Sequence, residues 1–369
     1  MFNIDSLLNK INLPLGEETY KEPLSILIKD YENHSSLTKL GSLSVQRGIV
    51  KTLESRGRLF QFINNNNLAE PSAPIIVSGL PRSGTTYLLD LLHCSDELRG
   101  PLTWEIFQMM PLATSPYQQT YKKIKTEAEL ALLKTLVPKL KNIHPMKAVL
   151  PEECQLITAL DFRSISFSYS SRVPEYTSFI NNCDYSSALL WHKRFLQALE
   201  TTSKPNYWLL KDPCHIQHIP EIISVYPEAK FVFIHRDPKD TIASISSLSA
   251  HLRAAFSNTV DQKEIGRNSL SFWSKAIQDF LAQRTLINES NVIDINFNEF
   301  IVNPVNSAET IFRKFKLSFD RHTREKMEVF INNKSQLGKS PHHYNLDAFN
   351  LTADQVSHSF KSYIEKFEL

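Results

Sequence analysis

A short loop rich in glycine and hydroxyl side chains carries the first chemistry in this sequence. It reads GLPRSGTT at residues 79–86, so four residues separate its two glycines. A short apolar run at residues 74–78 precedes it, and residues 85–94 after it have helical periodicity. In such a strand–loop–helix turn, backbone N–H groups and the positive end of the helix hold an anion. The candidate phosphate-binding residues are Arg82, Ser83, Gly84, Thr85 and Thr86.

The tip of this loop differs from that of proteins that hydrolyse nucleoside triphosphates. In those proteins a lysine follows the second glycine, and the Ser or Thr after it binds magnesium, whereas Thr85 and Thr86 occupy the two positions here. A loop without that lysine suits a donor that carries less charge than a triphosphate, such as a 5′-phosphate extended by a sulfuryl group. The loop therefore favours sulfuryl transfer over ATP chemistry.

A second candidate anion site follows another apolar run, residues 230–235. Arg236 stands at the end of this run, and Ser244 lies eight residues later in a stretch of helical periodicity. Ligands of open α/β sheets bind outside the carboxyl ends of the strands. There a guanidinium forms a charge-assisted fork with phosphate and a hydroxyl donates to it. An Arg-Asp-Pro turn alone is as often a helix cap, but two such signatures on one sheet favour binding.

Together, GLPRSGTT at residues 79–86 and HRDPKDTIASISSL at residues 235–248 resemble the sulfotransferases that use 3′-phosphoadenosine 5′-phosphosulfate (PAPS). The likeness extends to a group of largely bacterial sulfotransferases over residues ~74–365, where the motifs follow in the same order. The further strings of that group are TWE at residues 103–105, LKDPCH at 210–215, HRDP at 235–238 and a C-terminal stretch at 343–351.

The resemblance implies a donor site and a reaction. The first loop would hold the 5′-phosphosulfate of PAPS, Arg236 and Ser244 would hold its 3′-phosphate, and Lys339 is a further candidate phosphate contact. The implied reaction moves the sulfuryl group to a hydroxyl or amine by in-line displacement and releases 3′-phosphoadenosine 5′-phosphate (PAP). Such a reaction needs orientation, charge stabilisation and a base. PAPS is the expected co-substrate, and no metal is expected.

Two residues compete for the role of general base. By the resemblance, Glu105 follows the first helix as in relatives with a glutamate base, and His215 corresponds to the histidine that other relatives use. The TWE string favours Glu105. Lys211, at the end of the run 207–211, is expected to stabilise charge on the transferring group. Each of these residues also has a structural alternative. Glu105 would be a carboxylate that stabilises a helix N-terminus, His215 a packed imidazole ring and Lys211 an ordinary lysine at the end of a strand.

Four short apolar runs indicate buried strands, at residues 74–78, 207–211, 230–235 and 292–297. Because they alternate with helical stretches, the sequence predicts an α/β protein with a P-loop-like parallel sheet flanked by helices. We expect one domain over residues 1–369. Its predicted parts are an N-terminal helical layer (1–66), a nucleotide-binding core (74–104 and 205–303), a helical insertion that caps the acceptor side (105–200) and a C-terminal helical segment (304–369).

The predicted insertion is where an acceptor would bind. It carries Glu152 and Glu153 directly after Pro151, the ordinary composition of a helix first turn, so a structural role is expected before an acceptor-side one. Aromatic side chains in this region are more often core than pocket. The acceptor therefore stays open among small molecules such as phenols and amines, glycans, lipid-like alcohols and peptide tyrosine, and the oligomeric state stays open as well.

Composition argues against several other classes of protein. The balance of 41 Lys and Arg against 39 Asp and Glu gives a net charge of +2, which argues against a general binder of nucleic acid or of acidic membranes. The four cysteines lie far apart, without the spacing of a zinc site or a disulfide framework. No apolar run approaches the about 20 residues that span a bilayer, and no signal peptide is recognised. We expect a cytoplasmic protein.

Two other interpretations stay open. A kinase or hydrolase of nucleoside triphosphates would use the same loop, but it needs the missing lysine and a magnesium-binding carboxylate, for which Asp237 is the candidate. A protein that binds PAPS or PAP without catalysis would share both anion signatures. It would differ from an enzyme in the roles of Glu105, His215 and Lys211.

Overall fold

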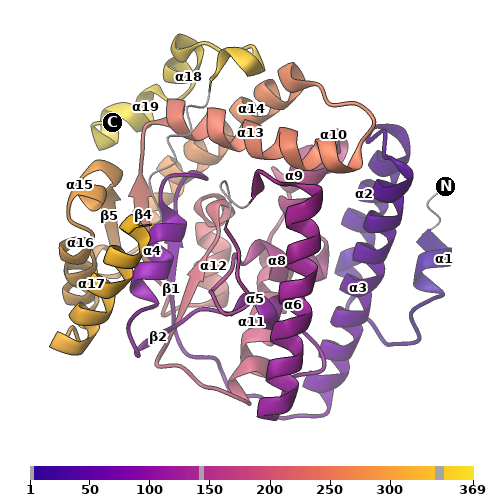
Figure 1. Ribbon diagram of the computed structural model, residues 1–369, viewed down its shortest axis with the longest axis horizontal. Coiled ribbons are helices and arrows are strands. Elements are labelled where there is room, and N and C mark those ends of the chain that lie inside the picture. The colour runs from indigo at the N-terminus through magenta and orange to yellow at the C-terminus, as the bar shows by residue number, and fades with distance from the viewer. Residues whose placement is uncertain (1–3, 141–144, 337–344) are drawn as a thin grey trace.

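The computed structural model describes residues 4–140, 145–336 and 345–369 (Figure 1). Lys339, the candidate C-terminal phosphate contact, lies outside the described residues. Among the residues that are described, no helix combines the length and the hydropathy that crossing a bilayer requires.

Five parallel strands form the central sheet, in the order β2-β3-β1-β4-β5. Their bounds are β1 (Pro74–Ser78), β2 (Leu98–Arg99), β3 (Tyr207–Lys211), β4 (Lys230–His235) and β5 (Val292–Asn296). β1 is central and buried along its whole length, which is why its sequence is apolar on both faces. The predicted parallel sheet is confirmed, and β2, only two residues long, is the strand that the sequence did not indicate.

Helices cover both faces of the sheet and extend well beyond one side of it (Figure 1). Before β1 come α1 (Ile4–Leu8), α2 (Lys21–Asn33) and α3 (Lys39–Asn64); α4 (Thr85–Leu92) follows β1. Between β2 and β3 lie α5 (Thr103–Phe107), α6 (Pro116–Leu136), α8 (Gln155–Thr158), α9 (Ser166–Ser170), α10 (Pro174–Ile180) and α11 (Ser186–Glu200). The remaining helices are α12 (Ile219–Val225), α13 (Pro238–Phe256), α14 (Gln262–Gln283), α15 (Phe297–Val302), α16 (Pro304–Phe315), α17 (Arg321–Gln336), α18 (Ala353–Ser359) and α19 (Lys361–Phe367).

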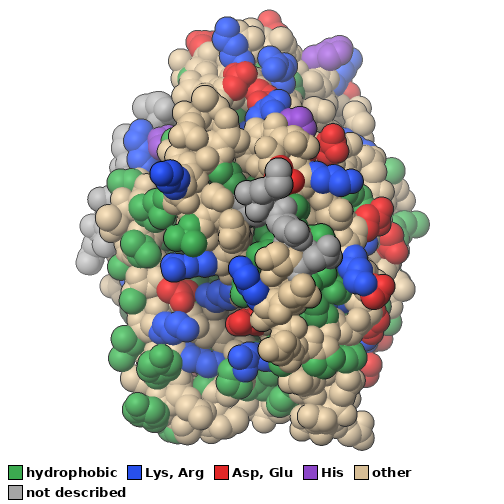
Figure 2. Space-filling view, turned by 90° about the vertical axis from the view of Figure 1, so that its right-hand side faces the viewer, with side chains coloured by type: hydrophobic (Ala, Val, Ile, Leu, Met, Phe, Trp, Pro, Cys, Tyr) green, Lys and Arg blue, Asp and Glu red, His purple; other side chains and the backbone are tan. Residues whose placement is uncertain are grey.

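A buried arginine attaches the N-terminal helices to the helices between β2 and β3. Arg56 of α3 is fully buried and donates to Asp161 Oδ1 at 2.8 Å and to the carbonyl oxygen of Leu15 at 2.7 Å. Its guanidinium also lies 3.8 Å from the ring centroid of Trp191. A buried charge is tolerated only when it is paired and hydrogen-bonded in this way. The N-terminal helices are therefore part of the same packed body as the helices between β2 and β3. Its outer side carries interspersed hydrophobic, basic and acidic side chains, as on an ordinary solvent-facing surface (Figure 2).

The C-terminal helix α19 returns to the carboxyl end of β4. His235, the last residue of β4, is bonded through Nδ1 to the Tyr363 hydroxyl at 3.0 Å and through Nε2 to Asp294 Oδ1 at 2.9 Å. The Phe367 ring stacks on the imidazole, with 3.6 Å between centroids. These contacts from α19 and β5 fix the backbone next to Arg236, so the far end of the chain supports the second predicted anion site.

Candidate active site

The loop between β1 and α4 folds back on itself through left-handed backbone. Gly79, Arg82 and Gly84 have φ values of 150°, 68° and 98°. A Cβ atom on Gly79 would lie 2.4 Å from the carbonyl oxygen of Ile234, and one on Gly84 would lie 2.9 Å from the Phe297 ring. Glycine is therefore required at both positions. The tight turn ends at the N-terminus of α4, where backbone N–H groups and the helix dipole favour an anion.

One hydroxyl in this loop fits a donor ligand. The Ser83 side chain is buried, and its Oγ has no hydrogen-bond partner within the described residues. A buried hydroxyl without a partner costs free energy, and a bound phosphate or sulfate oxygen would remove this cost if the loop moved to expose Ser83 to the cavity, whose described lining does not include it. Arg82, Gly84, Thr85 and Thr86 all line the cavity described below.

The second predicted anion site lies against the first. Arg236 Nη1 donates to the carbonyl oxygen of Arg82 at 3.0 Å, and Arg82 Nε donates to Ser244 Oγ at 3.1 Å. The contact arises because β1 and β4 are neighbours in the sheet, so their carboxyl ends meet. Arg236 also pairs with Asp240 at 3.0 Å and lies 4.3 Å from the Phe297 ring centroid. The structure thus brings both predicted anion-binding elements together on the same side of the sheet.

A cavity of about 400 Å³ opens beside this cluster, within the size range of small-molecule sites. One end is formed by the loop residues Pro81, Arg82 and 84–87 together with Arg236, and Ser83 is not among the described lining. The other end is apolar and draws its side chains from three separate regions of the chain. Those that matter below are Leu133, Leu140, Met146, Leu156, Leu248 and Leu252.

Two adjacent carboxylates line the cavity between its two ends. Glu152 and Glu153 are both buried, and the backbone N–H of Glu153 donates to Glu152 Oε1 at 2.9 Å. Lys211 forms an ion pair with Glu153 and donates to Thr86 Oγ1 at 3.1 Å. Gln155 donates to the second oxygen of Glu153. The group formed by Glu153, Lys211 and Thr86 therefore joins the acceptor side of the cavity to the last residue of the loop.

The charge state of Lys211 follows from its surroundings. Burial by itself would lower the pKa of Lys211, but the carboxylates of Glu153 and Glu152 outweigh burial and raise this pKa. Lys211 therefore stays protonated beside the loop. An ammonium group in such a desolvated position stabilises negative charge more strongly than the same group does in water.

The segment that carries these carboxylates is attached to the edge of the sheet. The prediction that Glu152 and Glu153 lie in the first turn of a helix was wrong, because α8 begins only at Gln155. Instead, Pro151 forms a bridge with Leu102, and the Cys154 N–H donates to the carbonyl oxygen of Lys211 at 2.9 Å. These backbone contacts between distant segments place the carboxylates at the carboxyl end of β3.

Glu105, the base that the sequence favours, is not among the described residues that line the cavity. It lies in the first turn of α5, where its Oε2 accepts from the Leu102 N–H at 2.8 Å and its Oε1 pairs with Arg99. Burial raises the pKa of Glu105, although the Arg99 guanidinium acts in the opposite direction. Both carboxylate oxygens are engaged by the chain itself, as expected of a helix-terminal carboxylate, but so are both oxygens of Glu153, so it is the cavity lining that separates the two residues.

His215, the other candidate base, is also absent from the described lining. It lies in the 3₁₀ turn Pro213–Gln217 and is 2% exposed. Burial lowers the pKa of His215 well below its usual value, so the ring is neutral. Neither ring nitrogen has a hydrogen-bond partner within the described residues. The ring is therefore enclosed and lies outside the described lining, in which its neighbour Pro213 takes part.

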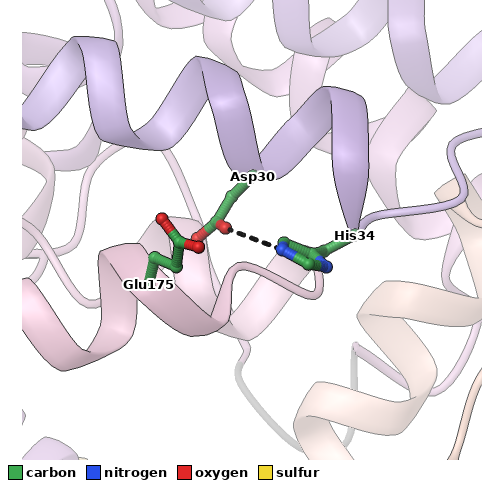
Figure 3. Close-up of side chains that lie close together, drawn as sticks. All are labelled: Asp30, His34 and Glu175. Atoms are coloured by element: carbon green, nitrogen blue, oxygen red, sulfur yellow. Dashed lines mark ion pairs between the residues drawn. The ribbon is translucent and has the colours of Figure 1, made fainter.

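Away from the cavity, the described residues contain one cluster with metal-ligand side chains, Asp30, His34 and Glu175 (Figure 3). Asp30 Oδ2 accepts from the Tyr176 N–H at 2.8 Å at the start of α10, and Oδ1 lies 3.8 Å from His34 Nε2. His34 Nδ1 faces the Arg172 guanidinium at 3.4 Å. A metal-bound histidine donates its other N–H to an acceptor, but the Arg172 guanidinium is itself a donor. His34 is therefore not placed as a metal ligand. The cluster fits a helix cap, in which Asp30 of α2 accepts from the start of α10, and the expected lack of a metal stays a prediction.

Comparison with known proteins gives matches in sequence over part of the chain. A model of the Sulfotransferase family matches residues 74–321. The chain is 27% identical over 181 residues to omega-hydroxy-beta-dihydromenaquinone-9 sulfotransferase Stf3 of Mycobacterium bovis and to the protein of the same name in Mycobacterium tuberculosis. This alignment covers 46% of the chain and 43% of each relative, less than half of their length.

Solved structures resemble the whole chain. Sulfotransferase STF1 from Mycobacterium tuberculosis has a TM-score of 0.80 at 24% identity, over 98% of this chain and 99% of that one. Sulfotransferase STF9 from Mycobacterium avium has a TM-score of 0.87 at 23% identity, over 100% of this chain and 97% of that one. The fold, including the N-terminal layer and the cap, is therefore shared. As the family model covers more than half of the sequence, the chain belongs to the sulfotransferase family.

Proposed function

We propose that this protein transfers a sulfuryl group from PAPS to the hydroxyl of an apolar, lipid-like acceptor and releases PAP. The observation that carries the proposal is the junction of two anion-binding elements at one end of one cavity. Arg236 contacts the carbonyl oxygen of Arg82 at 3.0 Å, and Arg82 contacts Ser244 at 3.1 Å. A nucleotide with phosphates at both its 5′ and 3′ positions is the ligand that needs two such elements side by side.

In this proposal the loop between β1 and α4 holds the 5′-phosphosulfate. Its backbone N–H groups, the buried Ser83 hydroxyl and the hydroxyls of Thr85 and Thr86 supply donors, and the N-terminus of α4 supplies positive potential. Arg236 and Ser244 hold the 3′-phosphate through a charged fork and a hydroxyl. Membership of the sulfotransferase family supports PAPS as the donor.

Glu153 is the base of the proposed reaction. Glu153 lines the cavity, and its ion-pair partner Lys211 donates to Thr86 of the loop. Glu105 and His215 are outside the described lining. The acceptor hydroxyl gives its proton to this carboxylate as the new oxygen–sulfur bond forms. The bond between sulfur and the bridging phosphate oxygen breaks, and PAP leaves with the electron pair. Lys211, held beside Thr86, stabilises the charge that develops on the leaving oxygen.

The acceptor end of the cavity favours a lipid-like alcohol over a glycan. A sugar needs several polar partners, but this end is lined by leucines and a methionine such as Leu133, Met146, Leu248 and Leu252. The name of the mycobacterial relative gives it a hydroxylated dihydromenaquinone as acceptor, and this supports a hydroxyl on an apolar carrier here. The cytoplasmic location and the lack of a nucleic-acid partner stay predictions from the sequence.

One assay separates this proposal from its rivals. The purified protein is incubated with sulfate-labelled PAPS and a long-chain primary alcohol, and in parallel with ATP and magnesium. We expect a labelled sulfate ester that forms together with an equal amount of PAP, and no phosphoryl transfer. Tight binding of PAP without transfer to alcohols, phenols, amines or sugars would indicate a binding protein instead. ATP turnover would indicate a kinase or hydrolase, although Asp237 is engaged as the cap of α13 through the Lys239 N–H at 2.9 Å.

A further inference from the structure

Helix α6 has apolar side chains on two opposite faces. The inner face carries Leu130 and Leu133, of which Leu130 is fully buried against the α13 side and Leu133 lines the cavity. The outer face carries Tyr117, Tyr121, Ile124 and Leu132, spaced by four, three and eight residues, which places them on one stripe of a helix. We call these four side chains the outer stripe. An ordinary surface helix has one apolar face, so the outer stripe is not explained by packing.

The outer stripe is strongly exposed. Tyr117, Tyr121, Ile124 and Leu132 are 81%, 60%, 65% and 62% accessible. Ala128 and Ala131, which lie between Ile124 and Leu132 along the helix, are exposed as well and extend the apolar surface. Single exposed hydrophobic side chains are common, but a continuous row of them marks an interaction surface.

The charges of α6 favour an anionic partner. The helix carries four lysines and two glutamates. Both glutamates are engaged within the chain: Glu127 accepts from the Ala148 N–H at 2.6 Å, and Glu129 pairs with Lys51 at 3.0 Å. Two of the lysines are engaged as well, since Lys122 and Lys134 donate to backbone carbonyl oxygens. Lys125 is exposed and follows Ile124 directly, so a positive charge borders the stripe. Aromatic and aliphatic side chains on one face with lysines at the border are typical of helices that lie in a membrane interface.

The helix that carries the outer stripe also forms part of the proposed acceptor end of the cavity through its inner face. Leu132 belongs to the stripe, and the next residue, Leu133, lines the cavity together with Leu140, Pro145 and Met146. The C-terminal half of α6 therefore lies between the outer stripe and the cavity. An acceptor that is dissolved in a bilayer could reach the cavity from this end without crossing water.

We propose that the outer stripe of α6 docks on the surface of an anionic lipid bilayer, from which an apolar acceptor passes over the end of α6 into the cavity. The second half of this proposal rests on the proposed function, whereas the docking itself does not. The small net charge of the whole chain argues only against general attraction to acidic membranes. The basic, apolar surface of α6 is local.

Vesicle flotation tests the docking without donor or acceptor. The full-length protein is mixed with vesicles of equimolar phosphatidylglycerol and phosphatidylcholine, and with vesicles of phosphatidylcholine alone. We expect stronger binding to the anionic vesicles, and a loss of at least about tenfold in partitioning for the double variant Tyr121→Gln, Ile124→Gln, because each removes one inserted apolar side chain. Lys125→Glu should weaken binding to anionic vesicles alone.

A matched control is the double variant Val302→Gln, Val329→Gln, which removes two apolar side chains that are 85% and 58% exposed on α15 and α17. It should bind vesicles as the unmodified protein does. The α6 variants should keep the circular dichroism spectrum and the PAP affinity of the unmodified protein, since their side chains make no contact with the loop. Equal vesicle binding by the α6 variants, or no vesicle binding by the unmodified protein, would overturn the docking.

Two further measurements separate the possible outcomes. If gel filtration shows a dimer that Tyr121→Gln, Ile124→Gln dissociates while vesicle binding is unchanged, a second copy of the chain covers the stripe and the proposal is wrong. Transfer is then compared between a short soluble alcohol and a long-chain alcohol embedded in vesicles. The α6 double variant should lose rate only with the embedded alcohol. Vesicle binding without transfer to either alcohol would reject the proposed function and leave the docking intact.

Discussion

The two ends of the cavity are built in opposite ways. The donor end consists of backbone turns and polar side chains from two continuous strings, the loop at residues 79–86 and the segment from Arg236 to Ser244. The acceptor end consists of apolar side chains from α6, from α13 and from residues 145–156, which are far apart in the sequence. The difference shows that anion binding can be encoded locally, whereas an apolar wall depends on how distant helices pack.

The same difference separates what each end contributes to a reaction. The donor end supplies charge, hydrogen-bond donors and a fixed orientation, which act directly on a phosphate and a sulfuryl group. The acceptor end supplies shape and exclusion of water, which select the molecule whose hydroxyl is presented. Glu153 and Lys211 stand between the two ends, so we expect substitutions there to affect turnover, and substitutions on either side to affect binding.

The largest expected effect is at this boundary. Glu153→Gln should lower kcat by about 100-fold or more while the PAP affinity changes little, because the side chain keeps its size and an oxygen for Lys211 but loses the negative charge that takes a proton and pairs with Lys211. Steady-state kinetics with a long-chain alcohol, together with calorimetric titration of PAP, measure both quantities. Glu105→Gln is the matched control, since Glu105 has the same type of side chain outside the described lining. Unchanged turnover of Glu153→Gln and a strong loss in Glu105→Gln would return the role of base to Glu105.

A smaller effect is expected at the apolar end. Leu252→Gln places a polar group in the wall of the cavity and should raise KM for a long-chain alcohol about tenfold, the factor that corresponds to the loss of one buried apolar side chain. The PAP affinity should stay within about twofold, because the donor end is untouched. Leu286→Gln, at a side chain that is 59% exposed, serves as the control. An equal loss of affinity for PAP and for the alcohol would show that the two ends are not independent.

The smallest effect concerns stability beneath the cavity wall. Burial, reinforced by the Glu153 carboxylate, raises the pKa of Asp212 to about 8. A carboxyl group whose pKa is higher in the folded state than in the unfolded state, where it is about 3.9, stabilises the fold most at low pH. This contribution is lost as the pH rises toward about 8. Asp212→Asn keeps an oxygen for the Cys214 N–H, which Asp212 Oδ1 accepts at 2.9 Å.

Thermal unfolding of the two proteins therefore has a predicted pH dependence. The Tm of Asp212→Asn relative to that of the unmodified protein should rise by a few degrees between about pH 5 and about pH 8, and should then level off. A constant difference in Tm over this range would mean that Asp212 is ionised in the folded protein. Asp354→Asn removes one carboxylate in the same way at an exposed position, and serves as the control.

The sequence predicted the donor end more completely than the rest of the molecule. The bounds of β1, β3 and β4 agree with the apolar runs, because strands buried on both faces need an unbroken apolar sequence. The approach of Arg82 to Arg236 followed from two strand ends that meet in a parallel sheet. These features depend on contiguous residues and on one rule of topology.

The base candidates show where such inference ends. Glu105 has the right residue type at a suitable distance along the chain, but Arg99 and the Leu102 N–H hold its carboxylate away from the cavity. Glu153 pairs with Lys211 across 58 residues of sequence, through a bridge and a backbone hydrogen bond that no local pattern encodes. The Pro-Glu-Glu string indicated only a helix start. A pairing of this kind follows from tertiary packing and needs the structure.

The central claim is that one nucleotide is held at both of its phosphate ends, by the loop at residues 79–86 and by Arg236. Calorimetric titration with PAP and with AMP, which lacks the 3′-phosphate, tests it in the unmodified protein and in Arg236→Ala. We predict that the unmodified protein prefers PAP by about 1.5–3 kcal/mol, and that Arg236→Ala removes this preference while its affinity for AMP is unchanged. If Arg236→Ala weakened PAP and AMP equally, or still preferred PAP as strongly, the 3′-phosphate would not bind at Arg236 and the claim would be contradicted.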